Sequence, residues 1–273
     1  MMMAMVLCVA MSVANVTEPT ASVVRTETGV RLVRGERMVW NLELDAADGK
    51  PYVHPLSTPS GVVLTDLAPE DHRWHKGLWF SWKFINGVNY WETPDKCGLG
   101  GAGKTVTKTN EVSIVGQDVT VRLMLAYLDA TGEVLSEKRT IRFFSPDATG
   151  GYSMSWEHEF MALKDITLDR TPPYLRKDGS KAGGYAGLTL RLSKLSAERF
   201  CRRTDGEHEV KFSDPSSGES IVMRAADEPS SACFYCWPDR RMLNLSPVYT
   251  APLTLKSGEK LHLRYTVKIN GAK

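Results

Sequence analysis

Hydrophobic and polar residues alternate along several segments of this chain. In residues 119–127 the odd positions carry valine, leucine and tyrosine, while threonine, arginine, methionine and alanine occupy the even positions. Residues 188–192 and 261–269 repeat the pattern. A period of two is typical of β-strands with one buried face, and turns rich in glycine, proline and aspartate separate the segments. The pattern predicts an antiparallel all-β protein with little helix, built as a sandwich or a large double sheet.

Two stretches interrupt this alternation, residues 54–110 and residues 164–187. Long excursions from a rigid β scaffold are usually functional loops. We therefore expect both stretches on one concave face, where the 54–92 loop and the 165–187 loop build a cleft. Because the chain has 273 residues and no proline-rich linker or internal repeat, we predict one domain over residues 21–273.

The first of these stretches concentrates side chains that can carry chemistry. It contains three of the six histidines, two candidate carboxylates and four of the seven tryptophans. Imidazoles and carboxylates transfer protons near neutral pH, and indoles offer flat faces on which a sugar can stack. The candidate catalytic residues are His72, His75, Asp71 and Glu92. The candidate substrate-binding residues are His54, Trp79, Trp91 and Arg170.

Several interpretations of these residues stay open. His72 or His75 could act as general base or acid with Asp71 or Glu92 as partner, or the aromatic residues could bind a ligand without catalysis. The residues could also be structural, with the tryptophans in the core and the histidines holding loops. Asp169 and Arg170 could form an ion pair that holds a turn. In the segment 156–160, strand geometry places Glu157 and Glu159 on one face and His158 on the other.

Two further motifs could indicate a metal site and a nucleotide site, and we predict neither. His72 and His75 could ligate a divalent metal with His54 or Glu92 if they lie on a loop, whereas on a strand they would face opposite ways; we predict no cofactor. Residues 98–105, GLGGAGKT, match the phosphate-binding loop. That loop needs a strand before it and a helix after it, but residues 106–115 are rich in β-branched side chains, so we predict a hairpin loop and no nucleotide hydrolysis.

Composition limits the partners and the compartment. A net charge of +2 gives no argument for nucleic acid, and basic pairs such as Lys138–Arg139 are expected on solvated faces. Residues 1–14 are apolar, too short to span a bilayer, and end in small residues, which predicts a signal segment over residues 1–20 and export to the periplasm or beyond. No other segment predicts an integral membrane protein. Four cysteines then remain, enough for two disulfides.

Three groups of residues resemble a bacterial family of unknown function, PmoA-like, whose members carry the label methane oxygenase PmoA. They are His54-Pro55 to Gly61, Asp71-His72-x-x-His75-Lys-Gly-Leu-Trp79, and Asn86-Gly-Val-Asn-Tyr-Trp91-Glu92, joined by Leu168–Pro172 and Gly183–Leu188. The resemblance covers roughly residues 20–270. A membrane-bound methane monooxygenase subunit needs spanning helices, which this chain lacks, so we do not expect that activity.

The resemblance implies a fold similar to the β-supersandwich of galactose mutarotases. It also implies a sugar or glycan-derived small molecule as ligand, with epimerase, mutarotase or lyase chemistry. A non-catalytic glycan-binding module and a structural envelope protein are the alternatives. Where the family reads Asp-His-x-His-His-Arg-Gly, this chain has Trp74 for the middle histidine and Lys76 for the arginine.

Overall fold

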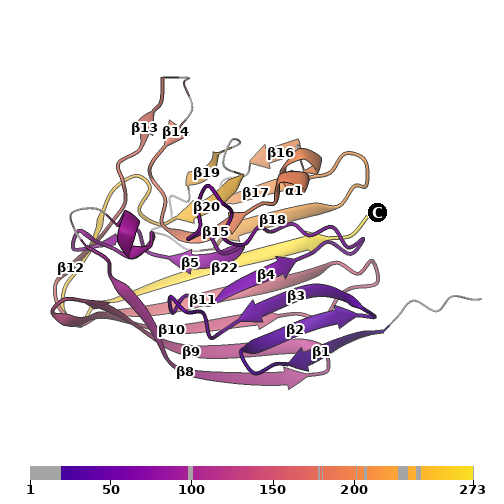
Figure 1. Cartoon of the computed structure of the whole chain (residues 1–273), viewed down its shortest axis with the longest axis horizontal. Coiled ribbons are helices and arrows are strands. Elements are labelled where there is room, and N and C mark those ends of the chain that lie inside the picture. The colour runs from indigo at the N-terminus through magenta and orange to yellow at the C-terminus, as the bar shows by residue number, and fades with distance from the viewer. Residues whose placement is uncertain are drawn as a thin grey trace, which may run out of the picture.

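The computed structural model of the protein describes residues 20–97, 101–177, 179, 181–200, 202–205, 208–226, 233–237 and 241–272. Within these residues, two eight-stranded antiparallel sheets face each other (Figure 1). The predicted antiparallel all-β sandwich is therefore confirmed. The signal segment predicted over residues 1–20 lies, apart from residue 20, outside the described residues.

The two sheets contain strands from nearly the whole chain. The first sheet has the order β1 (Ala21–Arg25), β2 (Gly29–Arg34), β3 (Arg37–Glu43), β4 (Tyr52–Leu56), β5 (Leu78–Ser81), β15 (Gly187–Arg191), β20 (Met242–Ser246) and β19 (Cys233–Trp237). The second has the order β16 (Arg202–Asp205), β17 (Glu209–Ser213), β18 (Ser220–Ala225), β22 (Lys260–Asn270), β11 (Tyr152–Ala162), β10 (Gly132–Phe143), β9 (Asp118–Asp129) and β8 (Lys104–Val115).

Small elements complete the described part of the fold. A four-stranded sheet has the order β21 (Leu253–Leu255), β12 (Ile166–Asp169), β6 (Phe84–Ile85) and β7 (Val88–Asn89), and a hairpin joins β13 (Tyr174–Leu175) to β14 (Lys181–Ala182). The helices are η1 (Pro94–Lys96) and α1 (Lys194–Arg199). The hairpin projects from the body of the sandwich (Figure 1). None of the described helices is long and apolar enough to cross a membrane.

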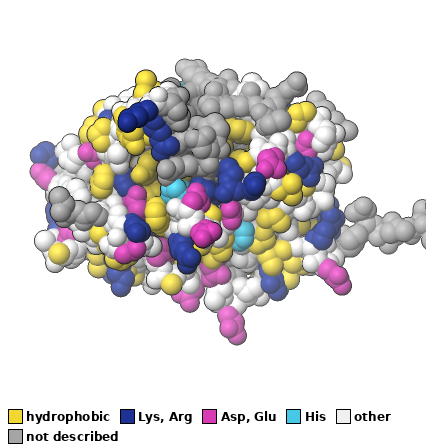
Figure 2. All heavy atoms as spheres, turned by 45° about the horizontal axis from the view of Figure 1, so that its top comes forward, with side chains coloured by type: hydrophobic (Ala, Val, Ile, Leu, Met, Phe, Trp, Pro, Cys, Tyr) yellow, Lys and Arg dark blue, Asp and Glu magenta, His cyan; other side chains and the backbone are white. Residues whose placement is uncertain are grey.

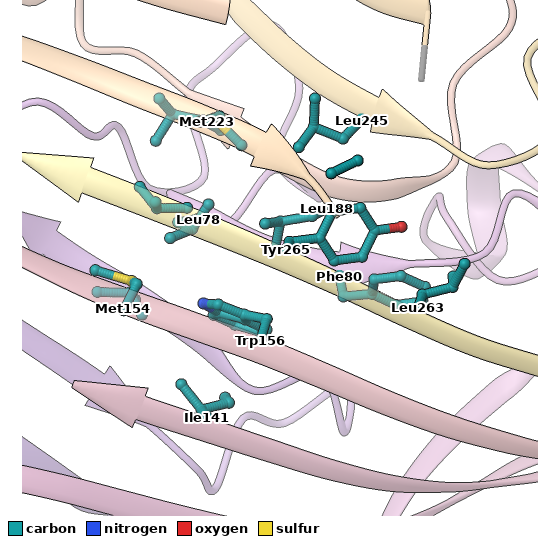
Figure 3. Packing of buried hydrophobic residues seen from close by; sticks show 14 of the residues in the cluster. Leu78, Phe80, Ile141, Met154, Trp156, Leu188, Met223, Leu245, Leu263 and Tyr265 are labelled. Atoms are coloured by element: carbon teal, nitrogen blue, oxygen red, sulfur yellow. The ribbon is translucent and has the colours of Figure 1, made fainter. Parts of the chain in front are cut away.

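The alternation of hydrophobic residues determines which strand faces are buried. In β22, buried and exposed residues alternate from Lys260 to Ile269, as period two requires. One cluster of buried hydrophobic side chains fills the space between the two sheets. Figure 3 shows part of this cluster, with Leu78, Phe80, Leu188 and Leu245 from the first sheet and Ile141, Met154, Trp156, Met223, Leu263 and Tyr265 from the second.

The core also contains a buried charged cluster, which the sequence did not predict. Glu137 accepts hydrogen bonds from Arg139 Nε at 2.6 Å and from Tyr127 Oη at 2.6 Å, and its Oε1 lies 2.7 Å from His158 Nδ1. The expectation that Arg139 is solvated is wrong, because alternate positions of β10 face the core and Arg139 pairs there with Glu137. His158 does face opposite to Glu157, as the strand pattern predicted.

Burial and ion pairing shift the pKa values of the residues in this cluster. Burial opposes ionisation of Glu137, but the charge of Arg139 and the hydrogen bond with His158 outweigh it, and they lower the pKa of Glu137 to about 2. Burial lowers the pKa of His158, and the neighbouring Glu137 only partly opposes this. The cluster therefore holds a carboxylate and a guanidinium that depend on each other inside an apolar core.

Candidate functional site

The outer face of the first sheet is covered around β5 and β15. Leu78 and Phe80 of β5 point into the core between the sheets, whereas Trp79 belongs to a second cluster on the outer face. Trp91, Ala182 and Met242 are the other buried members of this second cluster. Residues from both interrupting stretches thus meet on one face, as predicted. The stretches are not long loops, however, since β4 to β7 and β12 to β15 lie within or overlap them.

The segment 67–77 forms a tight loop rather than a strand. The backbone N–H of His72 donates to Pro69 O, and the N–H of His75 donates to His72 O, both at 2.9 Å. Ala68 N donates to His75 O at 2.8 Å and closes the loop. Of the two predicted alternatives, a loop or a strand around His72 and His75, the structure shows the loop. It brings the His72 and His75 rings together as a stacked pair, with centroids 4.7 Å apart and planes inclined by 28°.

Asp71 is the electrostatic centre of this loop. Its two carboxylate oxygens both lie 2.8 Å from Arg191 Nη2, and Oδ2 lies 2.9 Å from His72 Nδ1. The guanidinium of Arg191 is fully buried, whereas the Asp71 side chain is 47% exposed. Partial burial opposes ionisation of Asp71, but the hydrogen bonds and positive charges of Arg191 and His72 outweigh it and lower the pKa of Asp71 to about 2.

Aromatic rings continue the histidine stack into the protein. The His75 ring is buried and lies 5.2 Å from the Trp79 ring, which lies 5.4 Å from Trp91. The Trp91 ring in turn lies 5.1 Å from Tyr185, which comes from the second interrupting stretch. Trp79 and Trp91 are 0% and 1% exposed, so neither presents an open face for stacking on a sugar in this structure. Both rings instead pack against the buried ring of His75.

A pocket of about 430 Å³ opens beside Asp71. Its lining residues are Glu70, Asp71, Arg73, Trp74, Thr93, Asp95 and Lys96. Trp74 is half-buried, and its ring packs edge-on against His72 with centroids 5.1 Å apart. The indole at the pocket wall is thus Trp74, which the sequence interpretation noted only as a departure from the family pattern. Figure 2 shows acidic, basic and histidine side chains interspersed over the face turned toward the viewer.

Glu92 lies in a different charged pair. Its carboxylate accepts hydrogen bonds from Lys83 Nζ at 2.6 and 2.5 Å, and both side chains are largely buried. Burial lowers the pKa of Lys83, and the charge of Glu92 opposes this shift. The Lys83 ammonium also lies 5.2 Å from the centre of the Tyr185 ring. Glu92 is therefore bound to Lys83 on the Tyr185 side of Trp91, rather than paired with the histidines.

The remaining two candidates have local partners. His54 Nδ1 lies 2.9 Å from Thr65 Oγ1, and burial lowers the pKa of His54, partly opposed by Asp66. Arg170 pairs with Asp169 at 2.9 Å and donates to the carbonyls of Tyr249 and Thr250 at 3.2 and 3.0 Å. Arg170 therefore holds a turn, as one of the two interpretations of Asp169–Arg170 expected. No ring contact joins His54 to the histidine stack in the described part of the chain.

Sequence reasoning missed three buried cations of this face: Arg191, Lys83 and Lys50. Lys50 Nζ donates to Trp91 O at 3.2 Å, and burial lowers the pKa of Lys50 against the attraction of Asp48. Arg191 was assigned to the polar face of an alternating strand, but β15 is buried on both faces. A charged residue in a short strand covered on both sides needs a partner, and that rule would have singled out Arg191 had the covering loop been known.

The structure offers no evident metal centre among the residues it describes. No group of three or more histidine, cysteine, aspartate or glutamate side chains is arranged there to hold an ion. Cys97 Sγ lies 3.0 Å from Pro94 O. The side chains of the other three cysteines of the predicted exported chain lie outside the described residues.

Removing Arg191 tests the electrostatic account of Asp71. In Arg191→Met, we expect the pKa of Asp71 to rise from about 2 toward its ordinary 3.8, because only the His72 hydrogen bond would remain. In the native protein, Asp71 contributes stability that is present above pH 3.8 and lost as the pH falls through 2; the variant loses most of that window. A carboxyl ¹³C NMR titration measures the midpoint. Arg142→Met, on the other sheet, is the control, and an unchanged midpoint in Arg191→Met would contradict the account.

The fold and the candidate site together define the class of this protein. It is an all-β sandwich in which a histidine bound to a carboxylate lies beside a polar pocket. The chain belongs to the family described as "Family of unknown function (DUF6807)", whose profile matches residues 29–271. The prediction of a family of unknown function is confirmed. The description names no activity, and the methane oxygenase label is not part of it. No curated protein sequence matches the chain.

Several solved structures have low similarity to this chain, and three of them show the level of that similarity. Galactose 1-epimerase from Lactobacillus acidophilus NCFM has 10% identity and a TM-score of 0.39, over 94% of this chain and 100% of its own. A putative kojibiose phosphorylase from human microbiome has 8% identity and a TM-score of 0.34, over 62% of this chain and 22% of its own.

The third is the galactosidase domain of the alpha-galactosidase-sucrose kinase AgaSK, at 10% identity and a TM-score of 0.31 over 92% of this chain and 40% of its own. The chain thus spans about a fifth of the length of the phosphorylase. At these TM-scores the similarities carry no argument about what this chain binds or does.

Proposed function

We propose that this chain is an exported, carbohydrate-active protein in which His72 transfers protons to and from a sugar bound in the neighbouring pocket, which is lined by the two residues that His72 contacts, Asp71 and Trp74. The observation that carries the proposal is the contact between His72 Nδ1 and Asp71 Oδ2 at 2.9 Å, with Asp71 itself held by the buried Arg191. A carboxylate on one ring nitrogen fixes the tautomer of an imidazole and stabilises its protonated form.

The proposed roles follow from this arrangement. Asp71 stays ionised because of its lowered pKa, so Nδ1 of His72 carries the proton and Nε2 is the atom that accepts or returns one. The proton comes from a ring hydroxyl in mutarotation, or from a carbon next to a carbonyl in epimerisation or elimination. His75 supports the His72 ring by stacking rather than by reaching the substrate, because it is only 3% exposed.

The pocket beside Asp71 supports a polyhydroxylated ligand. Its wall combines the indole of Trp74 with hydroxyl, carboxylate and ammonium groups from Thr93, Asp95 and Lys96. An apolar ring next to several hydrogen-bonding groups suits a sugar, whose two faces are less polar than its rim. A binding module without catalysis would use the same pocket, so a test must separate binding from turnover.

The test is to incubate the full chain in D₂O with a panel of aldoses, ketoses and uronic acids and to follow each sugar by ¹H NMR. We expect one class of sugar to show accelerated anomer exchange, epimer formation, elimination or loss of a C–H signal to deuterium. Binding without any chemical change, detected by saturation transfer, would leave only the binding module. If no sugar is bound or altered, the carbohydrate proposal fails.

A further inference from the structure

A second polar pocket lies far along the sandwich from η1, beside the β2–β3 turn. It has a volume of about 750 Å³ and is lined by Arg34, Arg37, Ser60, Asp147, Gly150 and Glu219, among others. Ala21 and Ala272 also line it, so it lies at the end of the sandwich where the described chain starts and stops, on the right of Figure 1. The helix η1, beside the proposed sugar pocket, lies on the left.

The turn between β2 and β3 brings two arginines opposite each other. Arg34 ends β2, Arg37 begins β3, and the two residues are directly paired across the antiparallel hairpin. Directly paired residues point to the same face of a sheet, and like charges in this position destabilise it. Such a pair is usually neutralised by nearby carboxylates. Here neither guanidinium forms an ion pair with a carboxylate in the described part of the chain.

A backbone carbonyl holds Arg37, and both arginines lie beside glycines. Arg37 Nη1 donates to Ser60 O at 3.1 Å, and a Cβ built on Gly61 would lie 2.9 Å from the same nitrogen. A Cβ on Gly150 would lie 3.0 and 3.2 Å from the two terminal nitrogens of Arg34. Both guanidinium groups therefore lie against glycines, where any other residue would crowd them. None of these contacts neutralises the charge of either guanidinium.

The two carboxylates that line the pocket are engaged elsewhere. Glu219 is buried, and its oxygens accept hydrogen bonds from Ser60 N at 2.9 Å and Ser60 Oγ at 2.7 Å. Asp147 Oδ1 accepts from the backbone N–H groups of Thr149 and Gly151 and from the Thr149 hydroxyl. These bonds tie both carboxylates into the loops that build the pocket wall, so the arginines keep donors to offer a ligand.

We propose that Arg34 and Arg37 form an anion-binding site for a small oxyanion, a sulfate, phosphate or carboxylate group. An oxyanion between the paired guanidinium groups would accept charge-assisted hydrogen bonds from both and remove their mutual repulsion. The pocket is large enough for the group to be part of a bigger molecule, such as a sulfated or acidic sugar. The site is separate from His72 and does not depend on the proposed sugar chemistry.

Isothermal titration of the full chain tests this site, with inorganic sulfate, inorganic phosphate and glucuronate as probes at constant ionic strength. We expect saturable one-to-one binding of at least one probe, and a loss of affinity of about tenfold or more in Arg34→Gln, because a charge-assisted bond is removed. Which probe binds distinguishes a tetrahedral oxyanion from a carboxylate. Arg34→Gln removes no side-chain hydrogen bond or ion pair within the described residues, so it is expected to fold.

Arg122→Gln is the matched control, because Arg122 is an exposed arginine that does not line the pocket and makes only a weak ion pair, 3.8 Å from Glu111 on a neighbouring strand. Its affinity for the probe should stay within about twofold of the native protein. Circular dichroism and the melting temperature establish that both variants are folded. Absence of saturable binding for all three probes would overturn the proposal, and so would equal affinity in Arg34→Gln and the native protein.

Discussion

Glu137→Ala is expected to lower the free energy of unfolding by about 3–5 kcal/mol, the largest stability effect of any single substitution considered. The substitution leaves the fully buried guanidinium of Arg139 without its counter-ion. It also removes the acceptor of Tyr127 Oη and the partner of His158 Nδ1. An uncompensated charge in an apolar core costs far more than the pair itself contributes. Urea unfolding followed by tryptophan fluorescence measures the difference.

Two comparisons make this prediction specific to the buried charge. Glu157→Ala removes a carboxylate of β11 that pairs with Arg142 on the solvated face, and should cost less than about 1 kcal/mol. The double variant Glu137→Leu/Arg139→Met removes both charges and should be more stable than Glu137→Ala, even if the single variant is too unstable to purify. A double variant no more stable than Glu137→Ala would show that the charge of Arg139 is not the cause.

The buried cluster around Glu137 is a part of the fold that could not be predicted from the sequence. Alternation predicted the strands around residues 119–127, 188–192 and 261–269. In the first and third of these segments the polarity of most side chains matches the face they occupy, whereas in the second the polar Thr189 and Arg191 are buried. Glu137 and Arg139 occupy inward positions, yet they are charged. Their burial depends on partners from β9 and β11, which are near only after the sheet has formed. No local pattern encodes that pairing.

For the glycine-rich segment, by contrast, the neighbouring residues alone were sufficient to predict the structure that follows it. Residues 98–105 match a phosphate-binding loop, but such a loop must lead into a helix. The structure shows strand β8 from Lys104 to Val115, which begins within the last two residues of this segment and continues through the β-branched residues, as they predicted. Residues 98–100 themselves lie outside the described part of the chain. The prediction of a strand depended only on neighbouring residues, and it is confirmed.

For the candidate site, sequence reasoning predicted that most of these side chains lie close together, but not how they pair. Asp71, His72, His75, Trp79 and Trp91 do come together. The first three lie on one loop, Trp79 lies on β5, and Trp91 lies in the bend that follows β7. Arg191, 120 positions away from Asp71, holds that carboxylate and could not be assigned from spacing. The sequence also could not show which tryptophan side chains are exposed to solvent. The pocket indole is Trp74, whereas Trp79 and Trp91 are buried.

His72→Asn is expected to lower kcat by about 10²–10⁴-fold on the sugar that the panel identifies, because the amide cannot accept and return a proton. Substrate affinity should change only a few-fold, since Trp74 and the polar wall of the pocket remain. Asn is chosen because its amide can still donate to Asp71, as His72 Nδ1 does. NMR time courses at several substrate concentrations give kcat and KM separately.

The control is His262→Asn, which changes an exposed histidine of β22 on the outer face of the other sheet. It should leave kcat and KM unchanged. In Trp74→Ala the opposite pattern is expected, a higher KM with a smaller effect on kcat, because the indole contributes binding surface rather than a proton. If His72→Asn turns the sugar over as fast as the native protein, His72 is not the base. In that case, a loss of turnover in the double variant His72→Asn/Asp71→Asn would assign proton transfer to Asp71, whereas native turnover in the double variant would exclude both residues.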